Sequence, residues 1–133
     1  MPYDVAHAVD LPWEEREPMY GQAPRSQASI TEAAKLTESR ARMWRYPAHT
    51  RGRRHRDPDQ EEVYIPLAGS AQLVAGEDSF DLEPGMMIRV GPAQQRRIVP
   101  GPDGVRFIAL GGRPGAFEHS SWTELGAPPP QPQ

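Results

Sequence analysis

One stretch of the sequence gathers side chains that can transfer protons or bind metal ions. His55 and Asp57 precede Glu62, which begins an apolar segment, and Tyr64 lies two residues further on. Imidazole, carboxylate and phenol groups are the usual general acids and bases, and imidazole together with carboxylates also binds divalent metals. Side chains alternate along a strand, so Glu62 and Tyr64 share one face. The stretch therefore predicts acid–base or metal chemistry at one end of a strand.

Each of these residues also has a simpler interpretation. His55 and His49 lie in a charged run, where a solvent-exposed histidine is common, and Glu62 fits a structural ion pair that closes the mouth of a barrel. The run RGRRHR resembles a nucleic-acid-binding patch, but Asp57 and Asp59 follow at once and neutralise it. A solvated, salt-bridged loop is the better prediction for this run, because nucleic-acid binding needs a basic surface.

The elements around this stretch are short strands. Seven segments of four to seven residues are separated by glycine- and proline-rich turn signals, and no segment between them is long enough for a crossover helix. This pattern predicts an all-β fold, a six- to eight-stranded antiparallel barrel or double-sheet jelly roll. The predicted strands are residues 40–46, 62–68, 70–75, 79–82, 86–90, 96–99 and 105–111.

Two strands carry further information. Pro66 lacks the amide hydrogen that a central strand needs, so its strand is expected at an edge or with a bulge. In residues 40–46 the alternation allows only one of Met43 and Trp44 to face the barrel interior. The inward residue would form an apolar wall that orients a flat ligand.

The domain organisation follows from length and local composition. A chain of 133 residues suits a single domain. Residues 1–28 are polar and proline-bearing, which predicts a partly ordered N-terminal arm. Residues 29–118 form the predicted barrel domain and begin with a short helix over 29–36, capped by Ser29 or Thr31. Residues 119–133 end in GAPPPQPQ, which predicts a disordered tail.

The same residues carry a resemblance to the cupin superfamily. A first motif places Gly52, His55, Asp57, Glu62 and Gly69 on the frame of a glycine, a His-x-His pair, a glutamate and a later glycine. A second motif is similar at the turn Pro84-Gly85, and its histidine position falls on Arg96. Both motifs depart from the pattern, because Asp57 and Arg96 stand where histidines are usual. The resemblance covers residues 39–112 and implies a degenerate metal site inside an antiparallel barrel.

The resemblance implies one set of metal ligands and one arginine that departs from it. His55, Asp57 and Glu62, with His49 as a spare, would hold one divalent ion of Fe, Mn, Ni or Zn. Arg96 cannot ligate a metal, because its guanidinium stays protonated. It would pair with Glu62 or with an anionic ligand. A site without any cofactor is therefore an equal alternative.

Three functions remain open on this basis. The first is an enzyme of small-molecule metabolism, such as an isomerase, cyclase or decarboxylase. In it Glu62 is the acid or base, His55 its partner, and Tyr64 a hydrogen-bond donor. Arg96 then anchors the anionic substrate, with Trp44 or Met43 as the wall. The second is a metal-dependent oxygenase or isomerase, and the third is a non-catalytic small-molecule-binding module.

Composition excludes several other classes. The net charge is −3, which argues against nucleic-acid binding. The sequence contains no cysteine and no run of about 20 apolar residues, which excludes disulfides and predicts no membrane span. The N-terminal residues are acidic and proline-bearing, unlike a signal peptide, so the expected location is cytoplasmic. Small barrels often bury strand edges by pairing, and a homodimer with the N-terminal arm in its interface is expected.

Overall fold

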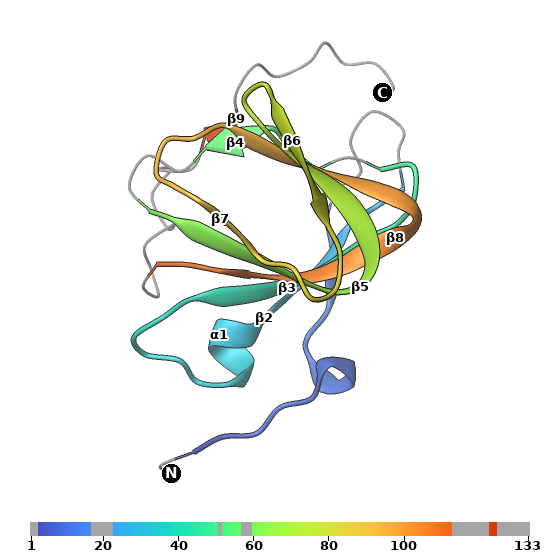
Figure 1. Cartoon of the computed structure of the whole chain (residues 1–133). Coiled ribbons are helices and arrows are strands. Elements are labelled where there is room, and N and C mark those ends of the chain that lie inside the picture. Colours follow the sequence, from blue (N-terminus) through green and yellow to red (C-terminus); the bar gives the residue numbers. More distant parts are fainter. Residues whose placement is uncertain (1–2, 17–22, 51, 57–59, 113–122, 125–133) are drawn as a thin grey trace.

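A single antiparallel sheet curls into a barrel (Figure 1). We describe it from a computed structural model, which places residues 3–16, 23–50, 52–56, 60–112 and 123–124. Within these residues the sheet has nine strands and is accompanied by a 3-10 turn, η1 (Ala8–Asp10), and a helix, α1 (Ile30–Ala33). The strands are β1 (Glu14–Glu15), β2 (Ser26–Ser29), β3 (Ala41–Tyr46), β4 (His55–Arg56), β5 (Glu62–Ala75), β6 (Asp78–Leu82), β7 (Ile88–Val90), β8 (Arg96–Leu110) and β9 (Thr123–Glu124). The predicted antiparallel barrel is confirmed.

Two long strands, β5 and β8, pair along most of their length and form the frame of the barrel. The sequence predicted four short strands here, and this was wrong, because β5 contains residues 62–68 and 70–75 in one element. The chain bends instead of turning: the register of β5 against β8 shifts between Pro66 and Ala68 and again between Gly69 and Ala71. The bulge expected at Pro66 is therefore confirmed.

Strand β3 pairs with β8 on one edge and with β2 on the other. Strand β2 crosses the domain boundary expected after residue 28, so the end of the N-terminal arm is built into the sheet. Helix α1 follows directly, and its cap is Ser29, whose hydroxyl accepts a hydrogen bond from the Glu32 amide. The short helix predicted at this place is confirmed.

The described part of the barrel has two apolar clusters, one on each side of β3. The inner cluster fills the barrel and includes Tyr64, Leu73, Leu82 and Phe107. The outer cluster joins Leu11, Ala28 and Met43, with α1 and the N-terminal segment packed over them. Because both faces of β3 are covered, its position in the sheet is fixed from both sides.

The charged loop predicted over residues 49–61 contains a short strand. His55 of β4 pairs with Arg96 of β8, which brings the histidine to the rim of the barrel. Part of this loop, including Asp57, lies outside the described residues, as does most of the expected tail over 119–133. No helix in the described part of the chain is long and apolar enough to cross a membrane.

Candidate functional site

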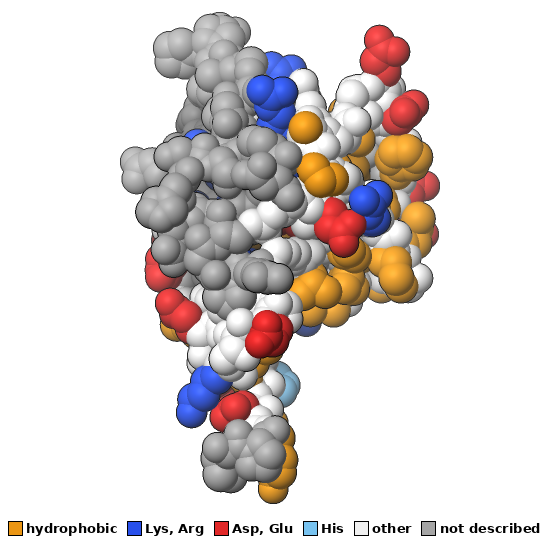
Figure 2. All heavy atoms as spheres, turned by 90° about the vertical axis from the view of Figure 1, so that its left-hand side faces the viewer, with side chains coloured by type: hydrophobic (Ala, Val, Ile, Leu, Met, Phe, Trp, Pro, Cys, Tyr) orange, Lys and Arg blue, Asp and Glu red, His pale blue; other side chains and the backbone are white. Residues whose placement is uncertain are grey.

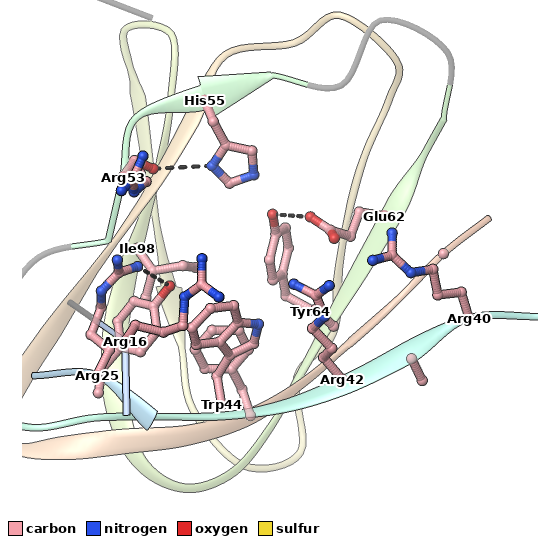
Figure 3. A pocket seen from close by; sticks show the side chains of 15 residues that line it. Arg16, Arg25, Arg40, Arg42, Trp44, Arg53, His55, Glu62, Tyr64 and Ile98 are labelled. Carbon is pink, nitrogen blue, oxygen red and sulfur yellow. Dashed lines mark hydrogen bonds between the residues drawn. The ribbon is translucent and has the colours of Figure 1, made fainter. Parts of the chain in front are cut away.

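The barrel interior holds a cavity of about 460 Å³, within the usual size range of small-molecule sites. Its walls are the inward side chains of β3, β5 and β8, together with residues of the arm and of the segment before β4 (Figure 3). The apolar part is aromatic. Trp44, Tyr46 and Phe107 form a chain of edge-to-face contacts, with ring centroids 5.6 Å and 5.1 Å apart. Such a wall suits a flat or unsaturated ligand.

Glu62 and Tyr64 form one polar unit with Arg96 at the end of β5. The Tyr64 hydroxyl donates a hydrogen bond to Glu62 Oε1. Arg96 Nε donates to the Tyr64 hydroxyl at 3.2 Å, and Arg96 Nη2 lies 3.2 Å from Glu62 Oε1. A third bond, from Arg96 Nη1 to the Gln94 carbonyl at 2.9 Å, fixes the guanidinium. The three side chains therefore hold one another in a closed triangle.

Two members of this triangle, Tyr64 and Arg96, have shifted pKa values. Burial, reinforced by the negative charge of Glu62, raises the pKa of Tyr64 well above 10, so the phenol keeps its proton. For Arg96, burial by itself lowers the pKa, but the neighbouring Tyr64 and Glu62 more than offset this and leave the pKa raised. Arg96 is thus a permanent buried cation, and Tyr64 remains a hydrogen-bond donor.

His55 lies across the cavity from this triangle, and its ring points toward Tyr64 and Glu62 (Figure 3). Its Nδ1 is 3.1 Å from the Arg53 carbonyl oxygen. A carbonyl only accepts, so Nδ1 must carry the proton and Nε2 the lone pair of the neutral ring. Burial lowers the pKa of His55 below its ordinary value near 6.5. The neutral, proton-accepting form therefore dominates at pH 7.

Among the residues that the structure describes, five arginines also line the cavity, against one glutamate. The sequence prediction missed all of them, because they come from four separate places in the chain. A signal was present in and just before β3, where Arg40, Arg42, Trp44 and Tyr46 are spaced two residues apart and so share the inner face. The two others from the arm are Arg16 and Arg25, and the fifth is Arg53.

Of the three residues expected to bind substrate, only Trp44 lines the cavity. Trp44 lines the cavity, whereas Met43 does not and packs outside β3 with Leu11 and Ala28. Arg96 is only 1% exposed and is not among the lining residues, so the expectation that it contacts substrate is corrected. It acts behind Glu62 and Tyr64. Glu62, Tyr64 and His55 all line the cavity, as the resemblance to cupins implied, and their catalytic roles stay predictions.

The described residues do not fit a metal ion. They contain no group of three histidine, cysteine, aspartate or glutamate side chains that could hold one. Of the expected ligands, His55 and Glu62 reach the cavity, Asp57 lies outside the described residues, and His49 is exposed in the turn after β3. Glu62 is already bound to Arg96 and Tyr64, and five lining guanidiniums would repel a dication.

Solved structures of other proteins share this arrangement of strands. A sugar phosphate isomerase of the cupin superfamily from Silicibacter pomeroyi aligns with 80% of this chain and 74% of its own, at 16% identity and a TM-score of 0.70. The chain has the cupin fold. The polyketide cyclase RemF from Streptomyces resistomycificus aligns with 84% of this chain and 81% of its own, at 20% identity and a TM-score of 0.68. KdgF from Halomonas sp. aligns with 79% of this chain and 90% of its own, at 13% identity and a TM-score of 0.66.

These likenesses concern the fold of the cupin barrel. No family model matches the sequence, and no curated protein matches it either. The structural neighbours carry names of different activities, an isomerase and a cyclase among them. A fold that hosts several reactions does not select one, so the reaction has to be inferred from the cavity.

Proposed function

We propose that this cupin binds a small organic acid in the barrel cavity and catalyses a proton transfer on it, without needing a metal for that step. The observation that carries the proposal is the lining of the cavity, where a neutral histidine faces a charged triangle among five arginines. Aldose–ketose isomerisation by proton transfer, aldol-type cyclisation and decarboxylation of a β-keto acid pass through carbanion- or enolate-like states. The isomerase and cyclase among the structural neighbours are compatible with such a step.

Each polar group has a role in this proposal. His55 accepts the proton through Nε2, because its Nδ1 proton is engaged by the Arg53 carbonyl. The lining arginines near Glu62, above all Arg42, stabilise the oxyanion that develops on the substrate. Arg96 holds Glu62 and Tyr64 in place from behind and is a positioning residue. Trp44 and Phe107 keep water from one face of the substrate.

The test is exchange of a substrate C–H hydrogen for deuterium, followed by proton NMR. Suitable probes are ribose 5-phosphate, glucose 6-phosphate and 2-oxoglutarate, which combine a carbonyl or latent carbonyl with an acidic group. We expect exchange with one or more of them and a loss of roughly 10²- to 10⁴-fold in His55→Gln. His49→Gln is the matched control, because His49 is exposed, and it should keep full activity.

The pH dependence gives a second readout. Since burial lowers the pKa of His55, the base stays neutral below pH 6.5, and kcat/KM should fall only at more acidic pH. His55→Gln should remove this acidic limb. Exchange that persists unchanged in His55→Gln would overturn the proposed mechanism, and anion binding without exchange would leave the alternative of a non-catalytic binding module.

The metal-dependent alternative is tested separately. Protein purified without chelator is analysed for Fe, Mn, Ni and Zn. Stoichiometric metal that is lost in both His55→Gln and Asp57→Asn would favour that alternative over the proposal.

A further inference from the structure

Two arginines in the cavity are charged but have no carboxylate partner among the described residues. Arg25 is 6% exposed, and within the described part of the chain it donates a 3.3 Å hydrogen bond to the neutral Tyr46 hydroxyl and stacks on the rings of Trp44 and Tyr46. Arg42 is half-buried, and no ion pair within 4.0 Å joins Arg25 or Arg42 to an acid in the described part of the chain. Buried charges are normally paired, because removing them from water costs free energy.

The two arginines lie on opposite sides of Trp44 in the cavity (Figure 3). Arg25 stacks on Tyr46, with its Cζ 5.3 Å from the ring centroid. Arg42 lies four residues before Tyr46 on β3, a distance of about 13 Å along a strand. Figure 3 shows Arg25 and Arg53 on one side of Trp44, and Arg42 and Arg40 on the other side, toward Glu62.

The Arg42 guanidinium is also repelled by another positive charge. Its pKa is lowered, first by burial and then by the like charge of Arg16, and Glu62 opposes this only in part. An anion bound between these groups would relieve the repulsion. Glu62 cannot fully neutralise these arginines, because Arg96 and Tyr64 already bind its carboxylate.

Building on the proposed function, we infer that the natural ligand carries two acidic groups, one for the Arg25 end and one for the Arg42 end, joined by a flat or unsaturated middle. Trp44 lies between the two ends and contacts Arg25, whose Cζ is 5.6 Å from its ring centroid, so the middle of the ligand would stack on the indole. The acid at the Arg42 end lies toward Glu62, a member of the charged triangle that His55 faces.

Benzoate and the three benzene dicarboxylates test this inference. They share one flat ring, and the ortho, meta and para isomers offer three separations of the two acids. Affinity is measured by titration calorimetry on the full chain at low and at 0.15 M salt. We expect the best isomer to bind at least tenfold more tightly than benzoate, and its monomethyl ester, with one charge fewer, to bind like benzoate.

Variants at each end complete the test. Arg25→Gln and Arg42→Gln should each abolish the tenfold advantage of the dicarboxylate, and Arg53→Gln replaces the first variant if Arg25→Gln fails to fold. Arg89→Gln is the control and should leave all affinities unchanged, because Arg89 is exposed and pairs with Glu61 away from the cavity.

The outcomes separate the two proposals. Equal affinity for benzoate and every dicarboxylate overturns the two-acid inference while leaving anion binding intact. If the dicarboxylate keeps its tenfold affinity advantage over benzoate in Arg25→Gln or Arg42→Gln, the two-acid inference is overturned as well. A complete lack of binding by all four acids would contradict the proposed function itself.

Discussion

Arg96 shows how strongly one residue depends on its partners. Its guanidinium is 1% exposed and is held by Glu62, Tyr64 and the Gln94 carbonyl. A buried ion pair adds little net stability over an apolar pair, because desolvation offsets the attraction. Removing one partner is different, since it leaves an uncompensated charge inside the protein. Arg96 therefore holds its neighbours in position, and its loss should lower the free energy of unfolding strongly only while Glu62 remains charged.

This leads to a prediction on unfolding free energy. Glu62→Gln should cost roughly 3 kcal/mol, because it leaves the Arg96 charge buried without its carboxylate. Arg96→Met should cost a similar amount, but the double variant should cost less than the sum, with a coupling of about 1–3 kcal/mol. Urea unfolding of the four proteins measures this.

The neighbouring pair Arg89–Glu61 supplies a matched control. Its atoms are 2.6 Å apart, but the side chains are 61% and 57% exposed. The same cycle, Glu61→Gln with Arg89→Met, should give a coupling below about 1 kcal/mol, because water screens an exposed pair. Equal coupling free energies in the two cycles would contradict the view that burial strengthens the Glu62–Arg96 interaction.

At the scale of the elements, the bend shared by β5 and β8 decides where the site residues lie. Gly69 and Gly104 face each other there with φ of +73° and +74°. A Cβ added to Gly69 would lie 2.1 Å from the Gly104 carbonyl oxygen, a backbone atom that cannot move aside cheaply. The close approach lets both strands curl around the cavity, so that Glu62 and Tyr64 at one end of β5 meet Arg96 at the start of β8.

We therefore expect Gly69→Ala to destabilise the protein by more than about 3 kcal/mol, since a backbone clash adds to the strain of positive φ. Gly76→Ala is the control. Gly76 has a similar φ of +62°, but its nearest neighbour is the flexible Gln94 side chain at 3.4 Å, so about 1 kcal/mol is expected. Thermal unfolding compares them, and equal losses would show that the strand contact is unimportant.

The whole molecule presents an N-terminal segment that projects from the barrel, as both outer views show (Figures 1 and 2). Tyr3, Val5 and Val9 in this segment are 70%, 93% and 76% exposed. Exposed apolar side chains on a projecting segment are typical of an arm that packs against a second subunit. The homodimer expected from the sequence, with the arm in its interface, therefore remains a prediction with candidate contact residues.

Gel filtration with light scattering should give twice the chain mass of 14.8 kDa. The variant Val5→Glu/Val9→Glu should elute as a monomer with unchanged circular dichroism, because charge in the contact disfavours pairing. A wild-type monomer at micromolar concentration would refute the dimer. A dimer that tolerates both glutamates would place its interface elsewhere.

Local sequence patterns determined much of this protein. The two-residue period put Glu62 and Tyr64 on one face, and it allowed only one of Met43 and Trp44 inside. The capping serine and the Pro66 bulge were also predictable, since each depends on the chemistry of a few adjacent residues. The cupin motifs led to the fold, although two of their metal-binding positions are substituted.

Only the tertiary structure decided the rest. Glycines with positive φ serve tight turns and bent strands alike, so the sequence could not tell that β5 continues through Gly69; its pairing with β8 settles this. The choice of Trp44 as the inner residue depends on the arm, which covers Met43 from outside. The convergence of five arginines and the burial of Arg96 behind Glu62 depend on how the sheet closes. Closure is set by long-range register, which no local run of residues contains.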